Sequence, residues 1–267
     1  MGTYLLLGTG AVIAGYAGTN AYQSRIRKKY DDGIDIKNQT VEIDPVERIR
    51  RCSYYKDVDI YNFYQTFCPN VQTVGDVFYH GYETSKNGPC IGFVNDGNKA
   101  EPIYWISYGM ALERIRKIGS HLWTNAKLTP MKSTVAILSL NRAEYSFVEH
   151  ASYMYGFIVL ALYTTYDSRT ILSILKKTQT DVLVVDNLER IDEFKNELFQ
   201  DTFLKEILVM DKVTDANVNS KVRDIPTVLE TMTNSDVRSR PKVDPESIAT
   251  YILTSGTTGK LIHTSVE

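Results

Sequence analysis

Short apolar runs alternate with amphipathic segments through the middle of the chain. Four runs are predicted to be strands: 134–140, 157–162, 181–186 and 205–210, and the first is apolar enough to be buried on both faces. The segments around them carry apolar residues at helical spacing, which predicts helices at 108–125, 144–155, 168–177 and 188–199. Strands that alternate with helices form right-handed crossovers. The sequence therefore predicts an α/β fold, a parallel sheet with flanking helices.

The region before this pattern is less regular. Residues 25–70 are polar and weakly periodic, so we expect an irregular extension there. Thr73 and Asp76 have the spacing of a capping box, which predicts a helix from there to Glu83. Strands are expected at 90–95 and 103–107, joined by a turn at 95–98.

A fifth apolar run, 248–253, leads into a segment rich in glycine and hydroxyl side chains. This segment reads Thr254-Ser255-Gly256-Thr257-Thr258-Gly259-Lys260. Glycines let the backbone approach a ligand, successive N–H groups can form an anion-binding nest, and the hydroxyls add donors. The lysine supplies positive charge for a phosphate. Because ligands gather beyond the carboxyl ends of parallel strands, we expect a polyphosphate to bind here. A surface turn of the same composition is the alternative.

The spacing of this loop excludes one phosphate-binding class and indicates another. A Walker-type loop, G-x-x-x-x-G-K-[ST], needs glycine where Thr254 stands and serine or threonine where Leu261 stands. The run T-S-G-T-T-G instead resembles the signature Y-T-S-G-T-T-G-x-P-K-G of the adenylate-forming, or AMP-binding, enzymes. That resemblance implies a loop that holds the β- and γ-phosphates of ATP while a carboxylate attacks the α-phosphate.

Three further segments are similar to one branch of that family, the eukaryotic long-chain fatty acyl-CoA synthetases. They are Pro102–Tyr108 (for E-W-x-S-Y), Asn141–Tyr145 (for N-R-P-E-W) and Ala161–Thr165 (for P-L-Y-D-T). The resemblance covers roughly residues 70–260 and implies the N-terminal part of the adenylate-forming fold. It also implies ATP and Mg²⁺ as cofactors, fatty acid and coenzyme A as substrates, and acyl-CoA, AMP and pyrophosphate as products.

The chain departs from the family signature directly after the loop. Lys260 is followed by Leu261-Ile262-His263, without P-K-G, and the sequence ends at Glu267. We therefore expect a truncated adenylation domain at 71–267, with no complete catalytic set and no metal site of its own. Its expected cofactor-binding residues are Thr254 to Lys260. The alternative is a non-catalytic, membrane-anchored fragment or pseudoenzyme that acts by binding a partner.

The N-terminus carries no charge from Gly2 to Ser24, and Arg25, Arg27, Lys28 and Lys29 follow at once. About 20 apolar residues can cross a bilayer, so 1–24 is predicted to be a membrane-anchor helix, with 3–22 in the membrane. The basic cluster then places the body on the cytosolic side. By family resemblance the membrane is that of the endoplasmic reticulum. A buried or interfacial helix is the alternative.

Composition excludes several other classes. Thirty basic and 32 acidic residues give a net charge of −2, which does not indicate a nucleic-acid partner. The cysteines, Cys52, Cys68 and Cys90, are odd in number and lack C-x-x-C spacing. They predict neither a disulfide framework nor a zinc site.

Overall fold

The computed structural model describes residues 37–57, 59, 68–93, 103–254 and 262–266. The chain divides into two compact units, Met1–Phe63 and Tyr64–Glu267. Each unit is described by itself. The predicted anchor, residues 1–24, lies outside the described residues. Among the helices that the structure does describe, none is long and apolar enough to span a bilayer.

The first unit contains a small hairpin where the sequence predicted an irregular extension. Strand β1 (Thr40–Asp44) pairs antiparallel with β2 (Ile49–Cys52), and a short 3₁₀ helix, η1 (Ser53–Tyr55), follows. The Asp44 carboxylate accepts the backbone N–H groups of Val46 at 2.8 Å and Glu47 at 3.0 Å. An aspartate that binds the following backbone stabilises a tight turn. The prediction was therefore wrong for residues 40–52.

The second unit is built on a seven-stranded sheet in the order β11-β10-β6-β5-β7-β8-β9. Six strands are parallel: β5 (Thr134–Leu138), β6 (Ile158–Ala161), β7 (Val182–Val185), β8 (Glu206–Val209), β9 (Val222–Asp224) and β10 (Thr250–Thr254). The last strand, β11 (Ile262–Val266), returns antiparallel beside β10. The predicted α/β fold with a parallel sheet is confirmed.

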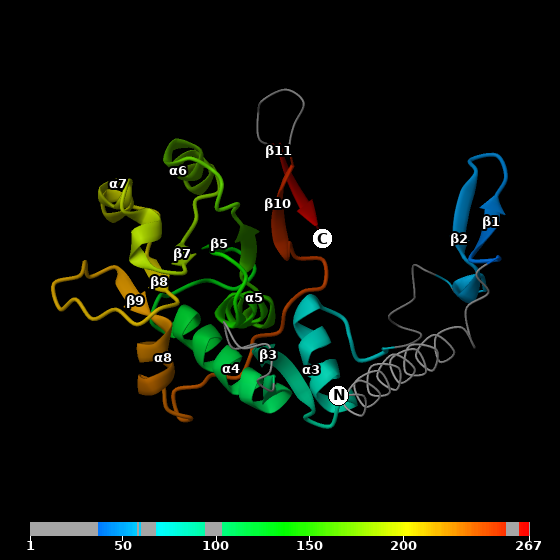
Figure 1. Cartoon of the computed structure of the whole chain (residues 1–267), viewed down its shortest axis with the longest axis horizontal. Coiled ribbons are helices and arrows are strands. Elements are labelled where there is room, and N and C mark those ends of the chain that lie inside the picture. Colours follow the sequence, from blue (N-terminus) through cyan, green and yellow to red (C-terminus); the bar gives the residue numbers. More distant parts are fainter. Residues whose placement is uncertain (1–36, 58, 60–67, 94–102, 255–261, 267) are drawn as a thin grey trace, which may run out of the picture. The chain divides into compact units, whose positions relative to one another are not determined.

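Helices cover both faces of this sheet, as Figure 1 shows. The helices of this unit are α4 (Tyr108–Thr124), α5 (Ala143–Tyr155), α6 (Ser168–Lys177), η2 (Leu188–Ile191), α7 (Lys195–Gln200), α8 (Ile225–Thr231) and α3 (Val74–Thr84), the last of which packs against α5 and α4. Val135 and Ile137 of β5 pack into the core beneath α4 and α5, whereas Ala136 and Leu138 pack into the core beneath α6. Successive strand residues point to opposite faces, which explains why these strands are apolar throughout.

Element boundaries mostly follow the predictions, but one predicted helix is broken and three elements were missed. The capping pattern is confirmed: α3 begins at Val74, and the Asp76 carboxylate accepts the N–H of Thr73 at 2.9 Å. The single helix predicted at 188–199 is wrong, because Phe194 leaves helical geometry (φ −136°, ψ 16°) between η2 and α7. Its side chain is buried, so core packing fixes this break. The sequence analysis also missed β9, α8 and β11.

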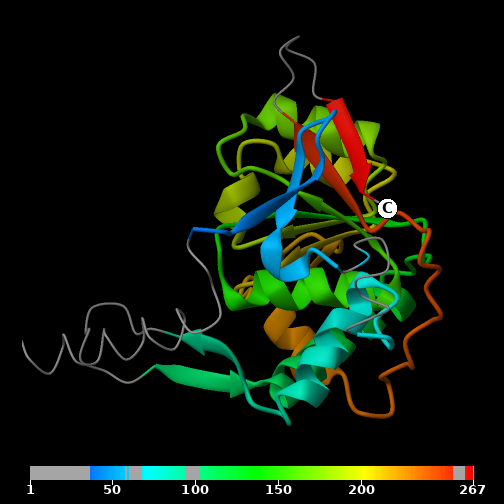
Figure 2. The same cartoon turned by 90° about the vertical axis from the view of Figure 1, so that its right-hand side faces the viewer.

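Strands β3 (Pro89–Phe93) and β4 (Tyr104–Ser107) form a separate two-stranded antiparallel ribbon. Both were predicted, and the turn expected at 95–98 lies outside the described residues. In Figure 2 this ribbon extends away from the seven-stranded sheet.

A long segment leads from α8 back to β10 and is bound to the helices on its way, among other places at Arg238. The Tyr155 hydroxyl lies 2.8 Å from the Arg238 carbonyl oxygen and 3.0 Å from Ser120 Oγ. Ser120 Oγ also accepts the N–H of Arg238 at 2.9 Å. These bonds join α4, α5 and the return segment, and so fix the path by which the chain enters β10.

Candidate functional site at the carboxyl edge of the sheet

The carboxyl ends of β5, β6 and β10 meet around a hollow of about 550 Å³. Strand β10 pairs with β6 through Thr250 and Tyr251, opposite Val159 and Leu160. These two residues of β10 also line the hollow. Its lining comes from Ser139–Asn141 and Tyr145 after β5, Ala161–Thr164 after β6, and Thr250–Leu253 of β10. Its size is within the range of small-molecule sites.

Two of the sequence motifs, at the two ends of the crossover from β5 to β6, meet at this hollow. Asn141 and Tyr145 belong to the first, and Ala161 to Thr164 belong to the second. The third motif, around Trp105, forms β4 and does not line the hollow. The structure therefore separates the motifs into a pair at the sheet edge and one on the ribbon.

The described lining of the hollow is neutral. Leu140, Tyr163 and Ile252 are 62%, 56% and 46% exposed, and they form an apolar rim. Ser139 and Asn141 supply hydroxyl and amide groups. None of the described lining residues is charged, so a phosphate held here would need its neutralising charge from other residues.

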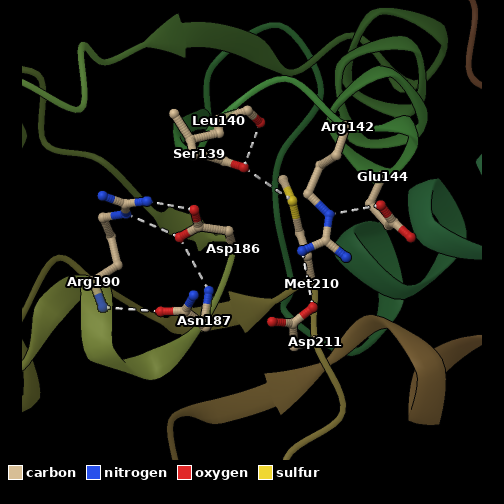
Figure 3. Close-up of polar contacts among 9 residues, drawn as sticks. All are labelled: Ser139, Leu140, Arg142, Glu144, Asp186, Asn187, Arg190, Met210 and Asp211. Carbon is tan, nitrogen blue, oxygen red and sulfur yellow. Dashed lines mark hydrogen bonds and ion pairs between the residues drawn. The ribbon is translucent and has the colours of Figure 1, made fainter. Parts of the chain in front are cut away.

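Charged side chains do occur at this edge, but they bind one another, as Figure 3 shows. Arg142, the N-cap residue of α5, donates from Nε to Glu144 Oε2 at 2.7 Å and from Nη1 to Asp211 Oδ1 at 2.8 Å. Burial lowers the pKa of Arg142, but the two carboxylates outweigh it and the pKa is raised. This group ties the start of α5 to the end of β8.

Asp186, directly after β7, anchors the neighbouring turn. Its carboxylate accepts from Arg190 Nε at 2.9 Å and Nη2 at 2.6 Å, and from the backbone N–H groups of Asn187 and Leu140. Burial by itself raises the pKa of Asp186, but these donors lower it by more. The net shift of the pKa is therefore downward. Ser139 Oγ donates to the Leu140 carbonyl at 2.8 Å (Figure 3). The wall of the hollow at Leu140 is thus fixed by a buried, charged aspartate.

Of the predicted site residues, the structure describes only the first. Thr254 is the last residue of β10 and lies at the carboxyl edge, opposite Ile262 of β11. Ser255, Gly256, Thr257, Thr258, Gly259 and Lys260 lie outside the described residues. The phosphate-loop assignment therefore stays a prediction.

Sequence reasoning missed several residues that define this edge, among them Leu140, Asp186, Arg190 and Asp211. Leu140, Asp186 and Asp211 each lie just beyond the carboxyl end of a buried parallel strand, a position where ligands gather, and that position was the available signal; Arg190 lies in η2 and had no such signal. Within the described ranges there is no group of three or more His, Cys, Asp or Glu side chains that could hold a metal ion.

Comparison with known proteins identifies the family. Residues 89–261 match the model of a family described as AMP-binding enzyme. The chain belongs to this family. The match extends from β3 into the predicted phosphate loop, so it includes the hollow and its surrounding elements.

Curated relatives narrow the resemblance. Long-chain-fatty-acid–CoA ligase 1 of Cavia porcellus is 28% identical over 96% of this chain, and its human counterpart is 29% identical over 96%. The chain spans 36% of the length of each of them. The anticipated likeness to the AMP-binding enzymes and to long-chain fatty acyl-CoA synthetases is confirmed.

Solved structures agree at the level of the fold. The anthranilate CoA ligase AuaEII, crystallised in complex with anthranoyl-AMP, superposes with a TM-score of 0.59. Its sequence is 17% identical, and the match covers 72% of this chain and 34% of that one. The sheet and helices described above are therefore those of this family.

Proposed function

We propose that the chain carries the phosphate-binding part of an ATP-dependent long-chain fatty-acid–CoA ligase. In that reaction a fatty-acid carboxylate attacks the α-phosphorus of ATP, the bond to pyrophosphate breaks, and an acyl-adenylate forms. The thiol of coenzyme A then attacks the acyl carbon and releases AMP. The observation that supports this best is the meeting of the Asn141–Tyr145 and Ala161–Thr165 motifs with β10 around one hollow.

We assign the phosphate contacts to the segment that follows β10. Backbone N–H groups and hydroxyls from Thr254 to Gly259 would bind the β- and γ-phosphates, and Lys260 would supply positive charge. The neutral lining of the hollow supports the assignment of the phosphates to this segment, because the lining leaves the neutralisation of phosphate charge to the loop. It does not fit a protein-held Mg²⁺ site, since Mg²⁺ prefers carboxylate ligands and no described lining residue has one. We therefore assign no step to a metal held by these residues.

We further propose that this polypeptide forms little or no acyl-adenylate by itself. The family signature continues with P-K-G, and this sequence has Lys260 followed directly by Leu261. The missing proline would stiffen the exit of the loop, and the missing glycine would permit close approach. A loose loop must be ordered on binding, at about 1–2 kcal/mol per residue.

ATP binding by the full chain tests the loop assignment directly. Replacing both hydroxyls (Thr257→Val with Thr258→Val) or the charge (Lys260→Met) should weaken the affinity for ATP by about tenfold or more, since hydrogen bonds to charged groups contribute about 1.5–3 kcal/mol. Inserting Pro-Lys-Gly after Lys260 should strengthen it by a similar factor. Thr202→Val, at an exposed threonine, is the matched control. Unchanged affinity in both loop variants would refute the assignment.

Pyrophosphate exchange tests the catalytic part separately. With ATP, labelled pyrophosphate and a long-chain fatty acid, we expect no exchange from the purified 267-residue chain. Robust exchange in a preparation shown to be free of host synthetase would overturn the proposal of inactivity and leave the loop assignment intact.

A non-catalytic role at a membrane is the second candidate, favoured by the uncharged stretch from Gly2 to Ser24 and the basic cluster that follows. We propose that this stretch anchors the protein in the endoplasmic reticulum with its body in the cytosol. Deleting residues 2–24 should then release the protein from membranes. Persistent association that resists alkaline carbonate after the deletion would contradict the anchor.

A further inference from the structure

The β3–β4 ribbon exposes a concentration of large apolar side chains. Phe93, Ile103, Tyr104 and Trp105 are 40%, 49%, 61% and 55% exposed, although all lie on or beside this one ribbon. The two strands, P-C-I-G-F and Y-W-I-S, contain no charged residue. Exposed apolar patches of this kind mark contact surfaces in soluble domains.

The register of the ribbon places these side chains on both of its faces. Phe93 lies opposite Tyr104, and Gly92 lies opposite Trp105. Because neighbouring residues in a strand point to opposite faces, Phe93 and Tyr104 share one face and Trp105 lies on the other.

Gly92 shows how closely the second face is packed. A Cβ atom at Gly92 would lie 2.9 Å from Ile103 Cγ2 and 3.2 Å from two ring atoms of Trp105. The absence of a side chain thus lets the indole ring lie against the strand, where one of its sides remains exposed.

A ribbon that is apolar on both faces restricts what can cover it. A flat protein surface would cover one face and leave the other in water, whereas the interfacial layer of a bilayer surrounds an element from several sides. Tyrosine and tryptophan are the side chains that favour this layer, because each joins an apolar ring to a polar group. In Figure 2 the ribbon extends away from the seven-stranded sheet of the same unit.

The sequence supplies a second, independent signal for the same partner. The uncharged stretch from Gly2 to Ser24 is followed by Arg25, Arg27, Lys28 and Lys29, and basic clusters attract anionic lipid headgroups. Stable attachment commonly needs two such signals. We propose that the β3–β4 ribbon is a membrane-contact element that places Trp105 and Tyr104 in the interfacial region of an anionic bilayer.

Trp105 provides a direct measurement, because the only other tryptophan of the chain is Trp123. The full chain is mixed with vesicles of phosphatidylcholine and phosphatidylserine whose acyl chains are brominated near the headgroup. Bromine quenches tryptophan only at close range. If the chain attached to the vesicle through another segment, Trp105 would therefore not be quenched. We expect quenching in the wild type and loss of most of it in Trp105→Phe, which keeps an aromatic side chain but removes the reporter.

Vesicle sedimentation with the Tyr104→Ser/Trp105→Ser variant tests the contribution to binding. We expect affinity for the vesicles to fall by about tenfold, which corresponds to about 1.4 kcal/mol. Phe203→Ser is the matched control, because Phe203 is a 43% exposed aromatic outside the ribbon. Circular dichroism of each variant verifies that it is folded.

Three outcomes would overturn the proposal. The first is that the chain sediments with vesicles while Trp105 is not quenched, which would mean that attachment does not use the ribbon. The second is that the Tyr104→Ser/Trp105→Ser variant binds vesicles as tightly as the Phe203→Ser control. The third is that, without lipid, Trp105 emission shifts to the blue as the protein concentration rises, which would mean that a second copy of the chain covers the ribbon. None of these results bears on ATP binding by the loop.

Discussion

Replacing Gly119 with alanine should destabilise the second unit through a steric conflict with Tyr155. A Cβ atom at position 119 would lie 2.2 Å from Tyr155 Cδ2 and 2.3 Å from Cε2. Tyr155 is 1% exposed, and its hydroxyl is held by Ser120 and by the Arg238 carbonyl. The ring therefore cannot move without breaking the bonds that fix the path to β10.

The expected loss of stability can be worked out from three contributions. Overpacking of a core costs about 1–3 kcal/mol. Two weakened hydrogen bonds add about 1–3 kcal/mol, and the better helix propensity of alanine returns about 1 kcal/mol. The net loss is about 3 kcal/mol, which for a unit of this size lowers the melting temperature by about 10 °C.

Urea unfolding followed by fluorescence in a Trp105→Phe background measures this effect locally, because the remaining Trp123 lies edge-on to Tyr155 with ring centroids 6.1 Å apart. Gly81→Ala is the control: Gly81 is also helical, but its new Cβ meets only the far end of the half-buried Tyr108 side chain. We expect that variant to stay within about 1 kcal/mol of the wild type. A Gly119→Ala variant as stable as the Gly81→Ala control would refute the packing described here.

Two further side-chain pairs give measurable predictions. The Asp186 pKa is lowered below the ordinary aspartate value of 3.8, so its stabilisation is fully present above that value and is lost as the pH falls from there through the lowered pKa of the folded state. Asp186→Asn should therefore lose stability at neutral pH and show a flatter acid limb in urea unfolding between about pH 7 and pH 3; an unchanged acid limb would contradict the shift. His121 Nε2 and Glu206 Oε1 lie 2.8 Å apart and are both buried, so His121→Ala should cost about 3–5 kcal/mol and His121→Leu/Glu206→Leu much less. Equal losses of unfolding free energy in the two variants would contradict this, because they would show that the cost does not come from leaving Glu206 without its partner.

The fold was predictable wherever hydrophobic periodicity and tertiary packing agree. Strands β5 to β8 and the helices between β5 and β7 follow from their apolar spacing, because both faces of this sheet are buried. The predicted helix at 188–199 failed because nothing in its spacing reveals that Phe194 leaves helical geometry to fill the core. A local break that depends on distant packing leaves no mark on the periodicity.

Other omissions had a readable signal. Helix α8 begins with Asp224 as N-cap, whose carboxylate accepts the N–H of Thr227 at 2.8 Å, and Pro226 lies in its first turn. Both residues are typical of a helix start. Strand β9 is only three residues long, and β11 lacks an apolar run, so neither gives a strong strand pattern.

The phosphate-loop assignment stays a prediction, whereas the hollow lies at the edge of the sheet where the sequence leads one to expect a ligand. A run of glycine and hydroxyl residues after β10 indicates a ligand at the carboxyl edge, and the hollow lies at that edge. The apolar rim at Leu140, Tyr163 and Ile252 was not predictable, because it depends on how β10 parts from β6 beyond Tyr251. The roles of Arg142 and Asp186 were not predictable either. Only their observed partners, Asp211 and Arg190, show that these charged side chains hold neighbouring segments in place.

Amide hydrogen exchange of the full chain, measured with and without ATP, tests the central claim most directly. If the segment after β10 holds the phosphates beside the hollow, ATP should slow exchange in residues 250–266 and in the two walls, 139–145 and 161–165. The Thr257→Val/Thr258→Val variant should lose that protection. Unchanged exchange in residues 250–266 at saturating ATP, or ATP-dependent protection confined to other parts of the chain, would contradict the account.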